Sequence, residues 1–307
     1  MISPNNIKEP LSFQQQLDHL INDKGLIVKN KNNALNILKH ENYYRLSGYM
    51  IDFLDENDKF INNTCFEDIY NIYKTDKEMR SILFELINDI EVYLKTQSAN
   101  YFSITYGALG YLDPDNYLYK SQGDYQKVIE FIKKCNEVNK KNEKSLIVSH
   151  HNNKYHGFMP IWAIFELMTF GTISKFYSLL KTTDKKGILR SGFKDINDKK
   201  LESMYHTVTN LRNQCCHYNR LYRKRNTIRC QKYTSKEINV SDYDTDTTYA
   251  SVISLLLINP NKKLGERAIG KLKNLSSHSH IDFCKNYGFP QNWKTELYEI
   301  NGHCIKQ

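Results

Sequence analysis

Apolar residues recur along this chain mainly at intervals of three and four, which is the period of an α-helix. The longest such segment covers residues 66 to about 106. Its expected core-facing stripe consists of Met79, Leu83, Leu86, Ile90 and Tyr93. The alternating pattern of half-buried strands is scarce, so the sequence predicts an all-α helical bundle.

Four further helical segments are expected in this bundle. One covers residues 125–138 and is followed by a polar stretch rich in Asn, Lys and His. Pro160 opens PIWAIFELMTFG, which is apolar on nearly every side and is therefore expected at the centre of the bundle. We expect Gly171 to interrupt this helix before a further run over residues 173–180. A polar loop over residues 234–248 then precedes a last apolar helix over residues 249–257.

The helix expected over residues 198–223 carries the most informative polar residues. Its apolar face consists of Met204, Val208, Leu211, Cys215, Tyr218 and Tyr222. At 100° per residue, the opposite face carries Asn213, His217, Arg220 and Lys224. Arg212 lies on the flank, about 140° from His217. Its long side chain or a distortion of the helix would have to bring the two groups together.

The charge balance favours a polyanionic partner. Lys and Arg outnumber Asp and Glu by 43 to 34, giving a formal net charge of +9. Such an excess attracts nucleic acid, although a solvated basic surface produces it as well. Seven cysteines without framework or zinc-ribbon spacing indicate a reducing cytoplasm. The N-terminus lacks a leader pattern and no apolar run is long enough to cross a bilayer, so we expect a soluble cytoplasmic protein.

Arg212, Asn213 and His217 suit the cleavage of RNA. The ribose 2′-hydroxyl is an internal nucleophile, so the reaction needs a base, an acid and a positive group at the phosphate. Histidine can transfer the proton and arginine matches phosphate oxygens. An amide one turn away can orient the imidazole or donate to phosphate. One stripe supplies one histidine, so two copies meeting in a dimer would give a more complete site. The alternative is an ordinary solvated helix face.

Five motifs occur in order along almost the whole chain. They are YYRLSGY at residues 43–49, DKEMRSILFELINDIEVYLKT, the P-x-W…E-x-x-x-F-G pattern of PIWAIFELMTFG, LRNQCCHYNRLYRKR at residues 211–225, and NYGFPQNW at residues 286–293. Together they resemble the Abi family of bacterial abortive-infection proteins, the AbiD/AbiF type. The resemblance divides the chain into an N-terminal extension (1–62), a HEPN-like helical bundle (63–233) and a short C-terminal region of loop and helices packing on the bundle (234–307).

HEPN ribonucleases carry an arginine, four to six residues and then a histidine, and Arg212 and His217 match this pattern. The resemblance therefore implies a metal-independent endoribonuclease with Arg212, Asn213 and His217 as catalytic residues. It implies a homodimer with one composite site, no cofactor, and a 2′,3′-cyclic phosphate product. It also implies a toxin or antiviral effector, which an antitoxin protein, a small RNA or a conformational lock must restrain. The sequence shows no antitoxin domain, so we expect control in trans.

Other residues are candidates for RNA binding. The basic residues after the motif are Arg220, Arg223, Lys224 and Arg225. They either contact RNA, which we favour, or complement the negative end of the helix dipole. In the N-terminal signature, Arg45 either binds RNA or seals the extension onto the bundle, whereas Tyr43 and Tyr44 are expected to pack.

Arg80 and Glu91 share a face of the first long helix because they are eleven residues apart. They form either part of the active-site floor or a structural ion network. Cys215 and Cys216 are expected to pack as small apolar side chains, with a redox role as the alternative.

Two functions other than a nuclease stay open. The first is a non-catalytic RNA-binding module that keeps the bundle and the basic segment. The second is a metalloenzyme built on His150, His151 and His156, which we disfavour because these residues and the pair His278 and His280 fall in segments expected to be solvated loops.

Overall fold

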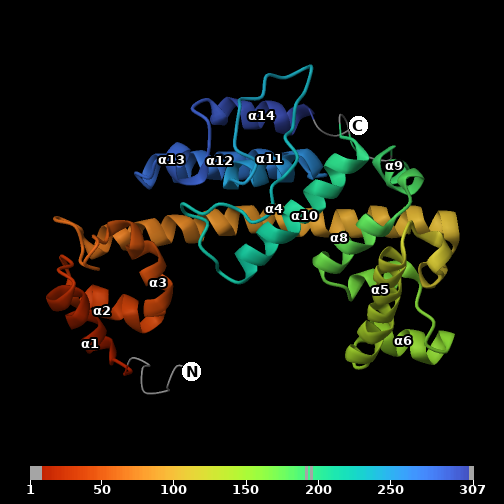
Figure 1. The fold of residues 1–307 in the computed structure, drawn as a ribbon, viewed down its shortest axis with the longest axis horizontal. Coiled ribbons are helices and arrows are strands. Elements are labelled where there is room, and N and C mark those ends of the chain that lie inside the picture. Colours follow the sequence, from red (N-terminus) through yellow and green to blue (C-terminus); the bar gives the residue numbers. More distant parts are fainter. Residues whose placement is uncertain (1–8, 191–192, 194–195, 304–307) are drawn as a thin grey trace. The chain divides into compact units, whose positions relative to one another are not determined.

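The computed structural model describes residues 9–190, 193 and 196–303, and all its regular elements are helical (Figure 1). Outside the helices this part of the chain contains isolated β-bridges. The prediction of an all-α fold is therefore confirmed. The described residues form two compact units, the first within the ranges 1–79 and 275–281 and the second within the ranges 80–274 and 282–307. Each unit contributes one part of the long helix α4 (Phe66–Tyr106).

The first unit contains the segment that we assigned to an N-terminal extension. Its helices are α1 (Phe13–Asp18), a π-helical turn (His19–Asp23), α2 (Lys31–His40) and α3 (Tyr43–Met50). The α-helices begin where Ser12, Asn30 and Asn42 accept hydrogen bonds from backbone N–H groups, as N-caps do.

The tyrosines of YYRLSGY have different environments in α3. The hydroxyl of Tyr49 donates to the buried carboxylate of Asp76 on α4, at 2.6 Å. Tyr44 lies on the other side of the helix and is exposed, because five residues correspond to about 500° of rotation. The expectation that Tyr44 packs is wrong, whereas Tyr43 is half-buried.

Helix α4 has the bounds that the sequence predicted. The side chains of Met79, Leu83, Leu86 and Ile90 are completely buried, as expected from the stripe. Leu94 continues the stripe, while Tyr93 is half-buried. The stripe is apolar at helical spacing over several turns, which identified both the type and the length of this element.

The second unit is built around the later part of α4, α8 (Phe170–Leu179), α10 (Asp198–Cys216) and α11 (Thr248–Ile258). Helix α10 packs against both α8 and α11. Helix α11 is buried on all sides, as the prediction of a last apolar helix requires. Further helices of this part are α5 (Gln122–Lys141), α7 (Ile161–Glu166), α9 (Thr182–Arg190), α13 (Phe283–Tyr287) and α14 (Trp293–His303). Helix α12 (Lys262–His278), like α4, contributes residues to both units.

Two predictions for the segments between α5 and α8 are wrong. The break after α7 is at Thr169 rather than at Gly171, because the Thr169 hydroxyl caps α8 by accepting from the N–H of Thr172. The polar stretch with three histidines contains α6 (Leu146–Tyr155) instead of a loop. Ser145 caps its first turn in the same way.

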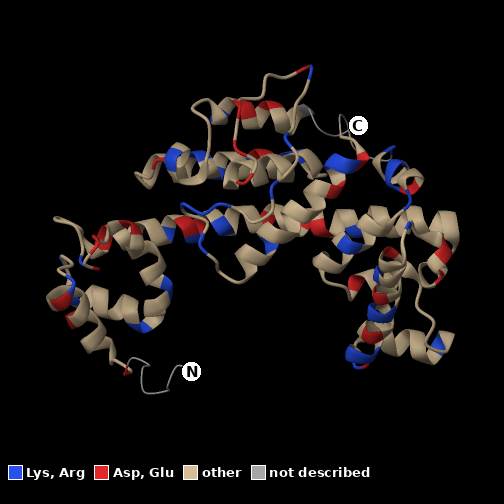
Figure 2. Cartoon of the chain, in the orientation of Figure 1, with Lys and Arg blue, Asp and Glu red and all other residues tan. Residues whose placement is uncertain are grey.

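Charged residues are spread along the helices, with Lys and Arg interspersed among Asp and Glu (Figure 2). Residues 218–247 form turns and bends without a helix, so the predicted polar loop is longer than expected. None of the helices among the described residues has the length and apolar character needed to cross a membrane.

Candidate active site at the end of helix α10

Helix α10 ends at Cys216, seven residues earlier than the sequence predicted. The N–H of Tyr218 donates to the carbonyl of Cys215 at 3.2 Å, and the N–H of Asn219 donates to that of Gln214 at 2.8 Å. This pair of bonds is the Schellman motif. Tyr218 has φ 55° at the position that glycine usually occupies, and its side chain is exposed rather than on the apolar face.

The early end of the helix changes which predicted residues share a face. Asn213 and His217 are one turn apart, and both side chains are exposed. Within the described part of the chain, the imidazole of His217 makes no hydrogen bond or ion pair. Arg220 and Lys224 follow the Schellman motif and do not continue this stripe, so that prediction is wrong. Cys215 is buried, as expected, and so is Tyr222.

Arg212 points toward α4 rather than toward His217. Its Nε lies 3.6 Å from the Glu91 carboxylate, and the other oxygen of Glu91 lies 3.1 Å from Nζ of Lys95. The Arg212 side chain keeps 31% of its surface exposed, whereas those of Glu91 and Lys95 are largely buried. The Glu91 carboxylate therefore forms ion pairs with two cations, those of Lys95 and Arg212. Lys95 was missed, although its position four residues after Glu91 is a recognisable helical pairing.

Arg80 supports the segment that follows the helix. Its side chain is buried and donates from Nη1 to the carbonyl of Asn219 at 3.2 Å. Asn219 closes the Schellman motif, so Arg80 and Glu91 both contact the motif-bearing segment from one helix. The sequence placed Arg80 and Glu91 on one face of α4, but it did not show which segment that face contacts.

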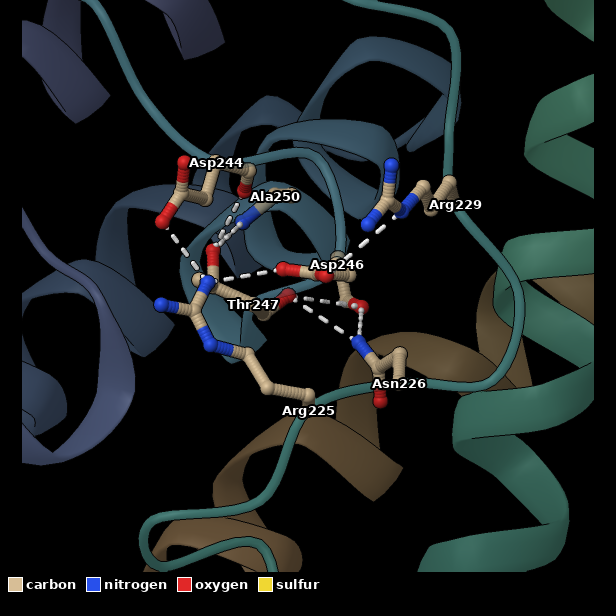
Figure 3. A network of polar contacts seen from close by, with 8 residues as sticks. Arg225, Asn226, Arg229, Asp244, Asp246, Thr247 and Ala250 are labelled. Carbon is tan, nitrogen blue, oxygen red and sulfur yellow. Dashed lines mark hydrogen bonds and ion pairs between the residues drawn. The ribbon is translucent and has the colours of Figure 1, made fainter.

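The loop after the motif is tied to the start of α11. Asn226 accepts from Gln214 at 3.0 Å and donates to the carbonyl of Thr247 at 3.0 Å. Arg225 donates to Asp244 and Asp246, at 2.7 Å each (Figure 3). These hydrogen bonds raise the pKa of the guanidinium of Arg225, which is exposed. The two carboxylates compete with any phosphate for this side chain.

Arg223 and Lys224 line a cavity of about 440 Å³ in the second unit. Arg223 has φ 51°, and both its backbone N–H and its Nε donate to Asn286, each at 2.9 Å. Asn286 begins the NYGFPQNW motif, so this motif holds the basic loop in place. Lys285 also lines the cavity.

The remaining candidates lie apart from α10. Arg45 is in α3 of the first unit, and the structure gives it no position relative to the second unit. His150 and His151 lie in α6, and His156 is the C-cap of that helix with φ 51°. His278 is the last residue of α12 rather than part of a loop, whereas His280 lies outside a helix as expected. Among the described residues no group of three or more His, Cys, Asp or Glu has the arrangement to hold a metal ion.

Comparison with known proteins identifies the family. A family model described as Abi-like protein matches residues 36–223, which is more than half of the 307 residues, and the chain belongs to that family. The match includes the YYRLSGY signature, α4, and the Arg212-to-His217 motif. No curated protein and no solved structure matches the chain.

Proposed function

We propose that this Abi-like protein is a metal-independent, HEPN-type endoribonuclease of the AbiD/AbiF type, acting in the cytoplasm as an abortive-infection effector. The main support is the end of α10. There Asn213 and His217 present exposed side chains one turn apart, and Glu91 holds the guanidinium of Arg212. An imidazole, an amide and a guanidinium are the groups that metal-free RNA cleavage needs.

The proposed reaction is attack of a ribose 2′-oxygen on the adjacent phosphorus. A base removes the 2′-hydroxyl proton while the O2′–P bond forms and the P–O5′ bond breaks. An acid returns a proton to the departing O5′. The products are a 2′,3′-cyclic phosphate and a 5′-hydroxyl. We assign one proton transfer to His217 and stabilisation of the phosphorane charge to Arg212, whose donors match phosphate oxygens.

A second copy of the chain would complete this site. Arg212 faces α4, while His217 faces solvent about 140° away around the helix. Two such ends meeting across a two-fold axis would supply two imidazoles, one for each proton transfer. We therefore propose a homodimer whose composite site binds RNA, and which is restrained in trans by an antitoxin or a structured RNA.

The decisive experiment is cleavage of total RNA and of tRNA by purified protein in EDTA, with product ends mapped. Wild type is compared with His217→Ala. The matched control is His40→Ala, because His40 is also an exposed histidine at the C-terminal end of a helix. Any co-purified RNA is removed before the assay.

Cleavage by wild type and by His40→Ala, but not by His217→Ala, with cyclic phosphate ends, would support the proposal. Equal cleavage by all three proteins would exclude His217 as a catalytic residue. RNA binding without cleavage by any of them, after RNA removal, would favour a non-catalytic RNA-binding module. If wild type cleaved RNA without EDTA but not with EDTA, the metal-free mechanism would be contradicted.

A further inference from the structure

A second cavity, of about 500 Å³, lies in the second unit at a distance along the chain from the motif. It is formed by the end of α6, the start of α7 and the turn after α4. Its chemically distinctive lining residues are His150, His151, Tyr155, Phe158, Pro160 and Trp162. Its size falls within the range of small-ligand sites.

Three large aromatic side chains of this cavity are exposed to solvent. The exposed fractions are 59% for Phe158, 53% for Trp162 and 45% for Tyr155. Aromatic rings normally bury most of their surface, and their gathering at one cavity marks a binding surface. The rings of His150 and His151 pack against Tyr155, with centroids 5.7 and 5.5 Å away. The wall of the cavity is therefore a connected set of flat π-faces.

The charges around the cavity favour an anionic ligand. None of the described residues that line it is acidic. Lys154 lies beside it, with Nζ 5.5 Å from the centre of the Tyr155 ring. A nucleic acid strand brings phosphates for the lysine and bases for the rings.

We propose that this cavity binds an unpaired nucleobase of an RNA strand by stacking, with Lys154 near the adjoining phosphate. Stacking on exposed rings beside basic residues is how proteins hold single-stranded nucleic acid. Nδ1 of His151 lies 2.8 Å from the carbonyl of Ile147. With that nitrogen donating to the carbonyl, Nε2 is the nitrogen that can accept a hydrogen bond from a base edge. The choice of RNA rests on the proposed function, but the site itself does not require cleavage.

Tryptophan fluorescence gives a direct test, because the chain has two tryptophans in different environments. Trp162 is exposed at the cavity, whereas Trp293 is 3% exposed. The probes are an oligouridylate and an abasic oligonucleotide of the same length and charge. They are titrated into the full-length His217→Ala protein, so that cleavage cannot alter the ligand. We expect quenching by oligouridylate and little by the abasic strand, and no quenching in the Trp162→Phe background.

A matched pair of tyrosine variants tests the same site by affinity. Tyr155 and Tyr298 both carry a lysine ammonium above the ring, at 5.5 and 5.4 Å, and Tyr298 is 38% exposed but does not line the cavity. We expect Tyr155→Ala to weaken oligouridylate binding by about fivefold to a hundredfold, the range for one stacked base, and Tyr298→Ala to leave it unchanged.

Three results would overturn the proposal. They are equal affinities for the two tyrosine variants, equal quenching by the abasic strand, and a change of oligomeric state in Tyr155→Ala with unaltered RNA binding. The last result would make this surface an interface between copies. Failure of the proposed nuclease function would appear instead as lack of cleavage by wild type while stacking persists.

Discussion

The ion cluster below the motif leads to a quantitative prediction for Glu91→Gln. The Glu91 carboxylate lies 3.1 Å from Lys95 and 3.6 Å from Arg212. With an effective dielectric constant of about 20, each pair contributes roughly 5 kcal/mol of Coulomb attraction before desolvation is counted. The amide removes the negative charge and leaves the two cations close together.

The net loss of stability is much smaller than that sum. Exposed ion pairs contribute up to about 1 kcal/mol, whereas removing one partner of a buried pair costs about 3–5 kcal/mol. The side chain of Lys95 is 10% exposed and that of Arg212 is 31% exposed, so the cluster lies between these limits. We expect Glu91→Gln to lower the free energy of unfolding by about 1–3 kcal/mol. Each kcal/mol lost lowers the melting temperature by about 2–4 °C.

The measurement is urea denaturation of Glu91→Gln, with Glu85→Gln as the matched control. Glu85 is on the same helix and pairs with Lys271, but both of these side chains are about half exposed. We expect the control to lose less than about 1 kcal/mol. A double-mutant cycle of Glu91→Gln with Lys95→Met should show coupling. Equal losses in the two glutamine variants, or a cycle without coupling, would refute the importance of this cluster.

Two further predictions concern helix α9 and its contacts with α4. In Gly187→Ala the new methyl group would overlap the ring of Tyr101, so we expect the free energy of unfolding to fall by about 1–3 kcal/mol in thermal or urea unfolding. The control is Gly171→Ala, for which we expect a small effect because the nearest side-chain atom to the new methyl group is 3.5 Å away. Burial raises the pKa of Asp184, although a hydrogen bond from Tyr106 opposes this, so the wild-type protein loses stability as the pH rises from 3.8 through the higher folded-state pKa. We expect Asp184→Asn, which can still accept that hydrogen bond, to be more stable than wild type at pH 7, with the gain disappearing near pH 3.5. A gain that is the same at both pH values would contradict this reasoning.

The sequence predicted the helices whose buried stripes are regular and missed features that depend on single hydrogen bonds. Helix α4 was predicted with its bounds because its apolar period persists for many turns. Helix α6 was missed because its polar residues give little contrast between faces, and a single cap at Ser145 starts it. The end of α10 was missed because glycine is the usual signal, and Tyr218 occupies that position instead.

The sequence predicted which residues belong to the candidate site better than it predicted their arrangement in space. Periodicity placed Arg80 and Glu91 on one face of α4, but it cannot show which segment packs against that face. Only the tertiary structure shows Glu91 beside Arg212 and Arg80 beside the carbonyl of Asn219. Ion pairs between helices distant in sequence have no local signal comparable to the i, i+4 pairing of Glu91 with Lys95.

The two ends of the Arg-to-His motif differ in how strongly the fold positions them, and this difference bears on how such a site can work. Arg212 belongs to the last turns of α10, and its Nε already lies at ion-pair distance, 3.6 Å, from the Glu91 carboxylate before any substrate arrives. His217 is the residue at which the helix ends, and its imidazole is exposed without a hydrogen bond among the described residues. A general base must be oriented to within hydrogen-bond reach of its proton, so in the proposed nuclease this imidazole would acquire its orientation from substrate or from a second subunit. Under the proposed function, the protein would stay inactive until those partners assemble, which is the property that a self-toxic nuclease requires.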